Sequence, residues 1–148
     1  MGDDVSAPWT LHPQLAADTV AVGDLPLSRL LLASDARYPW TILVPRRAGI
    51  RELHELDEAD QLQLLRESNQ LSRALIALFA PTKLNIAALG NVVPQLHVHH
   101  IVRHADDPAW PAPVWGRLPA LVYDEAARAG RIAALAAAFG PSLTPAVP

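Results

Sequence analysis

A long amphipathic segment in the middle of the chain most restricts the folds that this sequence can adopt. Its apolar positions recur every three or four residues, which is the period of one face of an α-helix. That face comprises Leu64, Ser68, Leu71, Leu75 and Leu78. Asp57 is a favourable N-cap in front of the segment, and Pro81 cannot continue a helix. The sequence therefore predicts a single helix that begins after Asp57 and ends before Pro81.

Short β-rich segments surround this helix. Those predicted as strands are Thr19–Val22, Arg29–Leu32, Thr41–Val44, Lys83–Leu89 and Leu96–Val102. The first two flank Gly23–Pro26, a connection with the composition of a hairpin turn. An alanine-rich segment from Asp124 to Phe139 predicts a second helix. An antiparallel strand pair followed by separate helices indicates the α+β class rather than a doubly wound parallel sheet.

The composition narrows the possible functions. Of the 148 residues, 51% are hydrophobic and 18% are charged, which is enough apolar material for the core of one domain. A net charge of −3 argues against a protein that binds duplex nucleic acid. The absence of cysteine excludes disulfide scaffolds, thiol catalysis and cysteine-ligated zinc. Because no apolar run is long enough to cross a bilayer and no signal peptide is evident, we expect a cytoplasmic protein without a membrane partner.

Four of the six histidines lie between His97 and His104. Side chains on a strand alternate in direction, so Gln95, His97 and His99 are predicted to form a polar ladder on one face. His100 would then point to the opposite face. Two neighbouring imidazoles oppose each other's protonation because adjacent cations repel. At least one of them is therefore expected to be neutral at neutral pH, and a neutral imidazole nitrogen can act as a nucleophile or base.

Three interpretations of this ladder compete. The histidines could be exposed side chains at a sheet edge, which is the usual interpretation of a single strand histidine. A His-x-His pair could chelate a metal, but no third ligand is evident, and His104 would have to fold back to supply one. The third interpretation is catalysis at a phosphate. The chain contains neither the dinucleotide-binding nor the P-loop glycine motif, so phosphate chemistry would depend on the histidines.

The histidine segment and its surroundings resemble the histidine triad (HIT) family. The family signature alternates three histidines with apolar residues, often after Val-Pro and before Arg, and Val93–Arg103 has this form apart from its first histidine. The resemblance covers about residues 15–117 and favours the bacterial diadenosine-polyphosphate-hydrolase-like branch. The other matching segments are Asp35–Pro45, Lys83–Asn85, Gly90-Asn91 and Asp107-Pro108, together with Trp110, Pro113 and Trp115.

The resemblance implies a five-stranded antiparallel sheet with a long helix and a C-terminal helix. It also implies a nucleotide-binding enzyme, commonly a homodimer, that cleaves or transfers at the α-phosphate without a metal or other cofactor. By position, His97 would be the nucleophile that bonds transiently to the nucleotidyl group, and His99 would contact phosphate or leaving-group oxygens. The residues at the family's substrate-binding positions are Asn85 and Asn91 for phosphate, and Ser34 and Asp35 for the ribose hydroxyls.

Two positions depart from the family pattern. Gln95 occupies the first triad position, and Trp40 occupies the place where many members carry a further, supporting histidine. In the family, the nucleophile is oriented largely by the main-chain carbonyl at the first triad position, which any residue supplies. A glutamine side chain can donate and accept hydrogen bonds but cannot titrate. We therefore expect Gln95 to remove a proton relay and to reduce or alter activity, while His97 keeps its role.

The sequence thus divides into four parts and supports two functions. The predicted parts are an N-terminal extension (1–14), a HIT-like domain (15–117), a C-terminal helical segment (118–139) and a loose tail (140–148). The first function is a hydrolase or nucleotidyl transferase that acts on a nucleoside polyphosphate, dinucleoside polyphosphate or phosphoramidate through His97. The alternative is a nucleotide-binding module with weakened turnover that acts as a sensor or partner.

Overall fold

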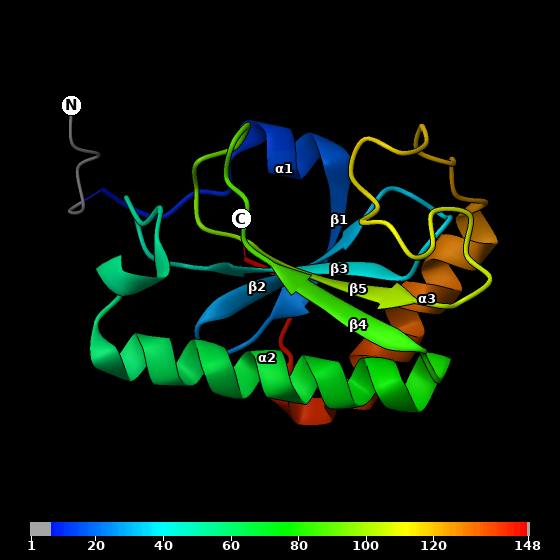
Figure 1. The fold of residues 1–148 in the computed structure, drawn as a ribbon. Helices are drawn as coiled ribbons and strands as arrows, with labels where there is room; N and C mark the ends of the chain where they lie inside the picture. The colour runs from blue at the N-terminus through cyan, green and yellow to red at the C-terminus, as the bar shows by residue number, and fades with distance from the viewer. Residues whose placement is uncertain (1–6, 148) are drawn as a thin grey trace.

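The computed structural model describes residues 7–147, which contain one antiparallel five-stranded sheet (Figure 1). Its strands are β1 (Thr19–Asp24), β2 (Ser28–Ala33), β3 (Trp40–Pro45), β4 (Lys83–Ala87) and β5 (Val98–Arg103). Their order across the sheet is β1-β2-β3-β5-β4, so the histidine strand β5 lies between β3 and the edge strand β4. The expected α+β fold with a five-stranded antiparallel sheet is confirmed.

Helices lie on both sides of the sheet. The long helices α2 (Glu58–Phe79) and α3 (Glu125–Phe139) cover one face, and the short helix α1 (Pro13–Asp18) lies over the other (Figure 1). Two single 3-10 turns occur at Leu53–Glu55 and Gly140–Ser142. Within residues 7–147, no helix has both the length and the apolar character needed to cross a membrane.

The two long helices begin at the caps that the sequence contains. The Asp57 carboxylate accepts a hydrogen bond from the backbone N–H of Asp60 at 2.8 Å. Asp124 makes the same contact with Ala127 at 3.1 Å. After α2, Ala80 adopts the left-handed conformation with φ of 45°, which ends the helix before the following proline. Both predicted helices are therefore confirmed.

Side-chain alternation along β5 assigns its residues to two different environments. Val98 and Val102 face α2 and join the larger apolar core, which contains the leucines of that helix. Ile101 faces the opposite side and packs with Tyr38 under the segment that follows β5. His99 shares the face of Ile101, so its ring lies on the side of the sheet away from α2.

His100 faces α2, as predicted, and links the sheet to that helix. Its Nε2 lies 2.7 Å from the Ser68 hydroxyl, and its Nδ1 lies 3.1 Å from the Val98 carbonyl. Because a carbonyl can only accept, Nδ1 carries the proton and Nε2 accepts from Ser68. Burial lowers the pKa of His100 from 6.5 to about 4. The neutral His100 thus explains why Ser68 occupies a polar position in the leucine face of α2: its hydroxyl donates to the histidine ring.

The expectation of a loose C-terminal tail was wrong. Backbone hydrogen bonds join Asp24 and Thr144 in both directions, at 2.7 and 2.9 Å, and form a bridge to the end of β1. A Cβ atom on Gly23 would lie 2.7 Å from the Leu143 side chain, so glycine permits this close approach. The tail is fixed because its backbone groups find partners on β1, a long-range pairing that its proline-rich composition does not reveal. Pro148 lies outside the described residues.

Helix α1 was not predicted, because its start signal is unusual. His12 acts as the N-cap, and its Nδ1 accepts a hydrogen bond from the Gln14 backbone N–H at 3.0 Å. Before it, Trp9 and Leu11 pack against the face of the sheet that α1 covers, beside Leu15. The described part of the expected N-terminal extension is therefore joined to the domain, while residues 1–6 lie outside the described residues.

The lowered pKa values of the buried histidines predict an acid-dependent loss of stability. Burial lowers the pKa of His99 and His100 below the ordinary value of 6.5, so the unfolded chain binds more protons between that pH and about 4. Stability should be complete above pH 6.5 and fall as the pH is lowered. Each histidine should contribute a slope of about 1.4 kcal/mol per pH unit between roughly pH 6 and 4.5.

Urea denaturation at several pH values measures this slope. His100→Gln retains an amide that can contact Ser68 but cannot titrate, so its slope should be smaller by the contribution of one proton. Equal slopes in the two proteins would contradict the assignment of a buried, neutral His100.

Candidate functional site

His97 lies in the loop that precedes β5 rather than on the strand itself. The strand begins at Val98, because the preceding segment leaves the sheet and the Leu96 N–H bonds instead to the Ile50 carbonyl at 2.9 Å. The predicted ladder was therefore wrong in placing Gln95 and His97 on the strand. The centroids of the His97 and His99 rings are nevertheless only 5.0 Å apart.

A short backbone contact fixes the His97 ring. Its Nδ1 lies 2.6 Å from the main-chain carbonyl oxygen of Gln95. The carbonyl can only accept, so Nδ1 carries the proton and Nε2 of the neutral ring has a free lone pair. This is the contact expected of the residue at the first triad position, and it does not depend on the Gln95 side chain.

His99 is held by two tryptophans. The Trp40 indole N–H donates to His99 Nδ1 at 2.9 Å, so a neutral His99 carries its proton on Nε2. The His99 ring centroid is 5.7 Å from that of Trp40 and 5.1 Å from that of Trp115. Burial, together with the nearby imidazoles of His97 and His100, lowers the pKa of His99 to about 3. The neutral imidazole that the sequence predicts is thus His99.

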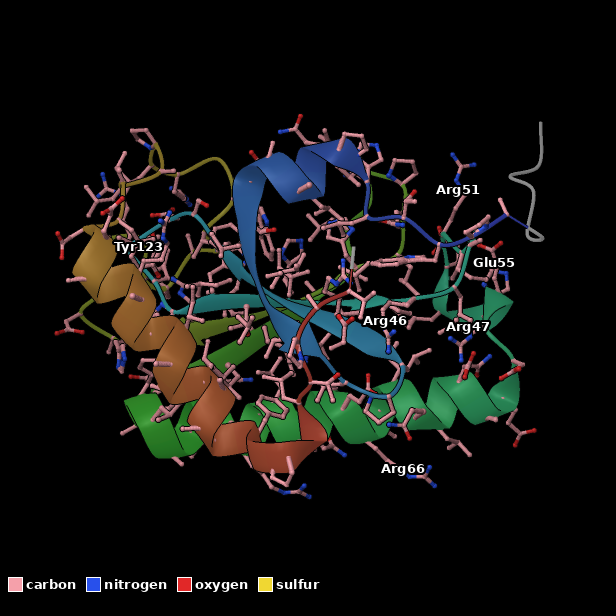
Figure 2. The ribbon with its side chains drawn as sticks, turned by 180° about the vertical axis from the view of Figure 1, so that it is seen from behind. Arg46, Arg47, Arg51, Glu55, Arg66 and Tyr123 are labelled. Carbon is pink, nitrogen blue, oxygen red and sulfur yellow. The ribbon has the colours of Figure 1, made fainter. Side chains whose placement is uncertain are left out.

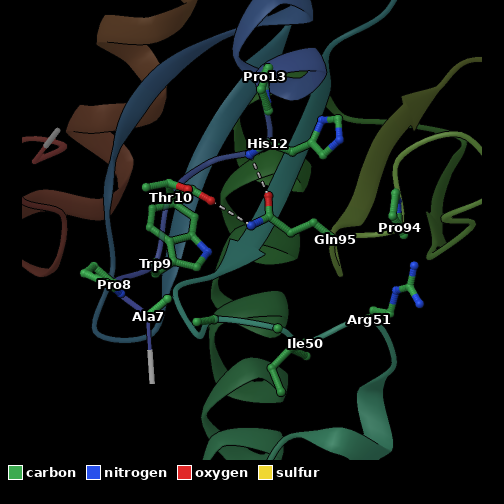
Figure 3. Close-up of a pocket in the computed structure, with 12 residues that line it drawn as sticks. Ala7, Pro8, Trp9, Thr10, His12, Pro13, Ile50, Arg51, Pro94 and Gln95 are labelled. Carbon is green, nitrogen blue, oxygen red and sulfur yellow. Dashed lines mark hydrogen bonds between the residues drawn. The ribbon is translucent and has the colours of Figure 1, made fainter. Parts of the chain in front are cut away.

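The Gln95 side chain is bound to the N-terminal segment. Its Oε1 accepts a hydrogen bond from the His12 backbone N–H at 2.9 Å, and its Nε2 donates to the Thr10 carbonyl at 2.9 Å (Figure 3). These two contacts imitate the pairing of a neighbouring strand and engage both ends of the amide. The residue at the first triad position thus acts through its main chain on His97 and through its side chain on the N-terminal segment.

Asn85 is oriented by a buried arginine. It lies on β4 opposite Ile101, on the same face of the sheet as His99. Arg103 is 1% exposed, donates to Asn85 Oδ1 at 2.8 Å and forms a two-point ion pair with Asp107 at 2.8 and 3.1 Å. Because the amide oxygen is occupied, the Asn85 amide N–H groups remain as donors for a ligand.

The other predicted binding residues lie in two separate loops. Asn91 is exposed in the loop before His97, and Ser34 is exposed at the end of β2. Asp35 is buried, and its Oδ1 accepts from the backbone N–H groups of Arg37 and Leu121 at 3.0 and 3.1 Å. This carboxylate therefore fixes the turn after β2 to the segment before α3. Within residues 7–147, no hydrogen bond joins Asn85 or these three residues to the two site histidines.

The two tryptophans after β5 have different surroundings. Trp115 contacts His99, whereas the Trp110 ring centroid lies 5.7 Å from the Arg103 guanidinium. Trp110 thus packs the segment after β5, and Trp115 forms a wall of the site. The direct contact from Trp40 to His99 was missed, although alternation on β3 could have placed these two side chains on one face.

Arg46 and Arg47, directly after β3, differ from Arg51 in their contacts. The Arg46 guanidinium donates to the Leu25 carbonyl at 2.6 Å, and Arg47 forms an ion pair with Asp60 at 2.7 Å. Arg51 extends away from the turn that carries Glu55 (Figure 2). Among residues 7–147, Arg51 has no ion-pair partner.

Two cavities are lined in part by Gln95, and His97 lines the smaller of them. The larger, of about 450 Å³, opens between the N-terminal segment, the loop at 48–51 and Gln95 (Figure 3). The smaller, of about 20 Å³, is lined by His97 and by residues 88–90 of the loop after β4. Arg51 and Gln95 line both cavities.

Residues 14–106, more than half of the chain, match the family described as HIT domain. The chain belongs to the HIT domain family. A comparison with curated proteins gave no match. A histidine triad protein from Bradyrhizobium japonicum is 49% identical, with a TM-score of 0.89, and the alignment covers 90% of this chain and 100% of that one.

Two other solved structures extend this comparison. A histidine triad protein from Marinobacter aquaeolei VT8 is 49% identical, with a TM-score of 0.85 and coverage of 93% of this chain and 97% of that one. A hypothetical histidine triad nucleotide-binding protein from Sulfolobus tokodaii is 14% identical, with a TM-score of 0.63 and coverage of 82% and 83%. At this identity, the likeness to the Sulfolobus tokodaii protein shows the fold alone. The predicted HIT family is confirmed by these matches.

In this HIT protein, one ring nitrogen of each site histidine contacts another residue of the chain. Within residues 7–147, no group of three or more histidine or acidic side chains is placed to hold a metal ion. His97 and His99 each use one ring nitrogen in a hydrogen bond within the protein. One nitrogen of each ring remains for a substrate, as a lone pair on His97 and as an N–H donor on His99.

Trp40 should determine which nitrogen of His99 carries the proton. In the intact protein, ¹⁵N chemical shifts of the His99 ring should show the proton on Nε2 at neutral pH. Trp40→Phe removes the indole donor and keeps an aromatic ring, so the proton should then distribute over both nitrogens. His97, held by a backbone carbonyl, should keep its proton on Nδ1 in both proteins. A His99 proton on Nδ1 in the intact protein would contradict the assignment.

Proposed function

We propose that this HIT protein is a nucleotidyl hydrolase or transferase that forms a covalent intermediate on His97. The observation that supports this most strongly is the 2.6 Å contact between His97 Nδ1 and the Gln95 carbonyl. It keeps the proton on Nδ1 and leaves the Nε2 lone pair available for attack. The substrate is a nucleoside polyphosphate, dinucleoside polyphosphate or nucleoside phosphoramidate, and the diadenosine-polyphosphate-hydrolase-like branch remains part of this proposal.

The reaction proceeds in two displacements at the α-phosphorus. His97 Nε2 attacks, a phosphorus–nitrogen bond forms, and the leaving group departs with the electron pair of the bond that breaks. The Nδ1 proton stays on the ring, where the Gln95 carbonyl stabilises the positive charge of the nucleotidyl-imidazolium. Water, or the hydroxyl group of another acceptor, then attacks the phosphorus, and its proton is released to solvent. The phosphorus–nitrogen bond breaks, and Nε2 regains its lone pair.

In this proposal, neutral hydrogen-bond donors stabilise the negative charge that develops on the phosphate oxygens in the transition state. His99 stays neutral because its pKa is lowered to about 3, and its Nε2–H is a donor for a phosphate or leaving-group oxygen. The Asn85 amide N–H groups, oriented by Arg103, and those of Asn91 are further candidate donors. Ser34 and Asp35 remain the proposed ribose contacts.

The alternative function is a nucleotide-binding module with weakened turnover. Gln95 supports it, because both ends of its side-chain amide are bonded to the N-terminal segment and neither can relay a proton. A homodimer is also proposed, and β4 supports it as an edge strand on which Ile86 is 51% exposed. A cytoplasmic location stays a prediction from the sequence.

Turnover of a substrate panel separates the two functions. Purified protein is incubated with adenosine and guanosine polyphosphates, dinucleoside polyphosphates and phosphoramidates, and released nucleotides are quantified. His97→Ala removes the nucleophile and should lower kcat by at least about a thousandfold. Gln95→Ala keeps the main-chain carbonyl while removing the contacts to the N-terminal segment, so it should retain turnover at roughly a tenth or more of the native rate.

Binding of these nucleotides without turnover would favour the module. Turnover that survives in His97→Ala would contradict the covalent mechanism. Melting temperatures of both variants identify any loss of activity that results from unfolding.

A further inference from the structure

A group that leaves the α-phosphorus must depart either as a stable anion or with a proton. When His97 Nε2 attacks, the phosphorus–nitrogen bond forms and the electron pair of the broken bond goes to the leaving atom. The bridging oxygen of a polyphosphate carries that pair as a phosphate anion and needs no proton as the bond breaks. The bridging nitrogen of a phosphoramidate needs one, because an amide anion is too basic to form. The substrate class therefore depends on whether the site contains a proton donor.

The Trp40 indole prevents His99 from acting as that donor. An imidazole that gives up a proton to a leaving group must first be an imidazolium, in which both ring nitrogens carry protons. The Trp40 N–H donates to His99 Nδ1 at 2.9 Å, so a proton on Nδ1 would place two donors against each other. Because His99 is only 7% exposed, breaking this contact would leave a buried donor without a partner.

The groups around His99 also oppose a positive charge on its ring. The residues opposite it on β3 and β4 carry no charge. Burial, together with the imidazoles of His97 and His100, lowers the pKa of His99 to about 3. The charged side chains of the segment after β5, Arg103 and Asp107, form an ion pair with each other at 2.8 Å. No neighbouring carboxylate is thus shown to compensate a cation at His99.

The other polar groups beside His97 do not supply a proton to a leaving nitrogen. His97 attacks through Nε2, and its Nδ1 proton is bonded to the Gln95 carbonyl at 2.6 Å. The Gln95 amide does not titrate, and both of its ends are bonded to the N-terminal segment. Arg51 and Glu52 line the smaller cavity together with His97. A guanidinium keeps its proton, and an ionised carboxylate can only accept a hydrogen bond.

We propose that Trp40 and Gln95 together restrict this protein to phosphoanhydride substrates, whose leaving group departs as a phosphate or nucleotide anion. The inference rests on the proposed function and selects one class among its candidate substrates, because a nucleoside phosphoramidate would lack the proton that its amine needs. Trp40 is a positioning residue that acts through the His99 ring. The His99 Nε2–H still donates a hydrogen bond to a departing oxygen, which stabilises an anion without transfer of a proton.

A matched pair of substrates tests this restriction. Adenosine triphosphate and its α,β-imido analogue differ only in the atom that bridges the first two phosphorus atoms, and each releases adenosine monophosphate. The value of kcat/KM is measured for both between pH 6 and pH 8, and His97→Ala gives the background. Trp40→Phe removes the N–H that blocks Nδ1 and keeps an aromatic ring. Trp115→Phe is the matched control, because within residues 7–147 this indole contacts the His99 ring without a hydrogen bond to it.

The native protein should prefer the oxygen bridge by at least about a hundredfold, the contribution of a missing general acid. This preference should be the same at pH 6 and pH 8. Trp40→Phe should reduce it by at least about tenfold, and more at pH 6 than at pH 8, because a proton can then enter at Nδ1. Trp115→Phe should keep the native preference. The ratio is compared rather than either rate, since a change at the site can slow both reactions.

Several results would overturn the inference. A native preference below about tenfold is one, and a preference that falls as the pH is lowered is another. An unchanged preference in Trp40→Phe, or an equal change in Trp115→Phe, would also do so. If native protein cleaves the imido analogue and Glu52→Gln does not, Glu52 is the acid and the inference is wrong. If Trp40→Phe does not fold, the pH profile of the native preference decides the result.

Failure of the proposed function has a different signature. If no substrate shows turnover that depends on His97, the covalent mechanism itself is contradicted. Cleavage of both bridges at similar rates, lost in His97→Ala, would leave the covalent mechanism intact and contradict only the restriction to phosphoanhydrides.

Discussion

The alternation of side chains along β5 determines both the core that faces α2 and the candidate site on the opposite face of the sheet. His99 and Ile101 face the side of the sheet away from α2, while Val98, His100 and Val102 face α2. A shift of one residue would place the neutral His100 in the site and expose His99 to the leucine face of α2. The Ser68 hydroxyl opposes such a shift, because it gives His100 a partner at one level of the helix only. Core packing and site geometry are therefore set by the same register.

The site histidines are held by groups that do not titrate near neutral pH. A backbone carbonyl fixes His97, and an indole N–H fixes His99. Both contacts determine which nitrogen carries the proton without adding a charge to the site. The two departures from the family pattern therefore have defined roles. Gln95 orients His97 through its main-chain carbonyl. Trp40 supports His99 instead of the residue at the first triad position.

Local patterns predicted the elements well, because their signals lie within a few residues of one another. The caps at Asp57 and Asp124 and the leucine spacing are of this kind, and the histidine spacing predicted the family. The predictions that were wrong concern features that depend on contacts between distant segments. The docking of the tail on Asp24 and the departure of His97 from the strand rest on backbone hydrogen bonds across the fold. The role of the Gln95 side chain could not be predicted either, because its partners lie 83 and 85 residues away in the sequence.

Trapping the covalent intermediate tests the central claim most directly. Protein is mixed with a nucleotide that carries ³²P at the α-phosphate, quenched within the first turnover, and digested for peptide sequencing. The account predicts an acid-labile, base-stable label on Nε2 of His97, because the Gln95 carbonyl occupies the Nδ1 side of the ring. Turnover without any labelled protein, or a label on another residue or on Nδ1 of His97, would contradict it.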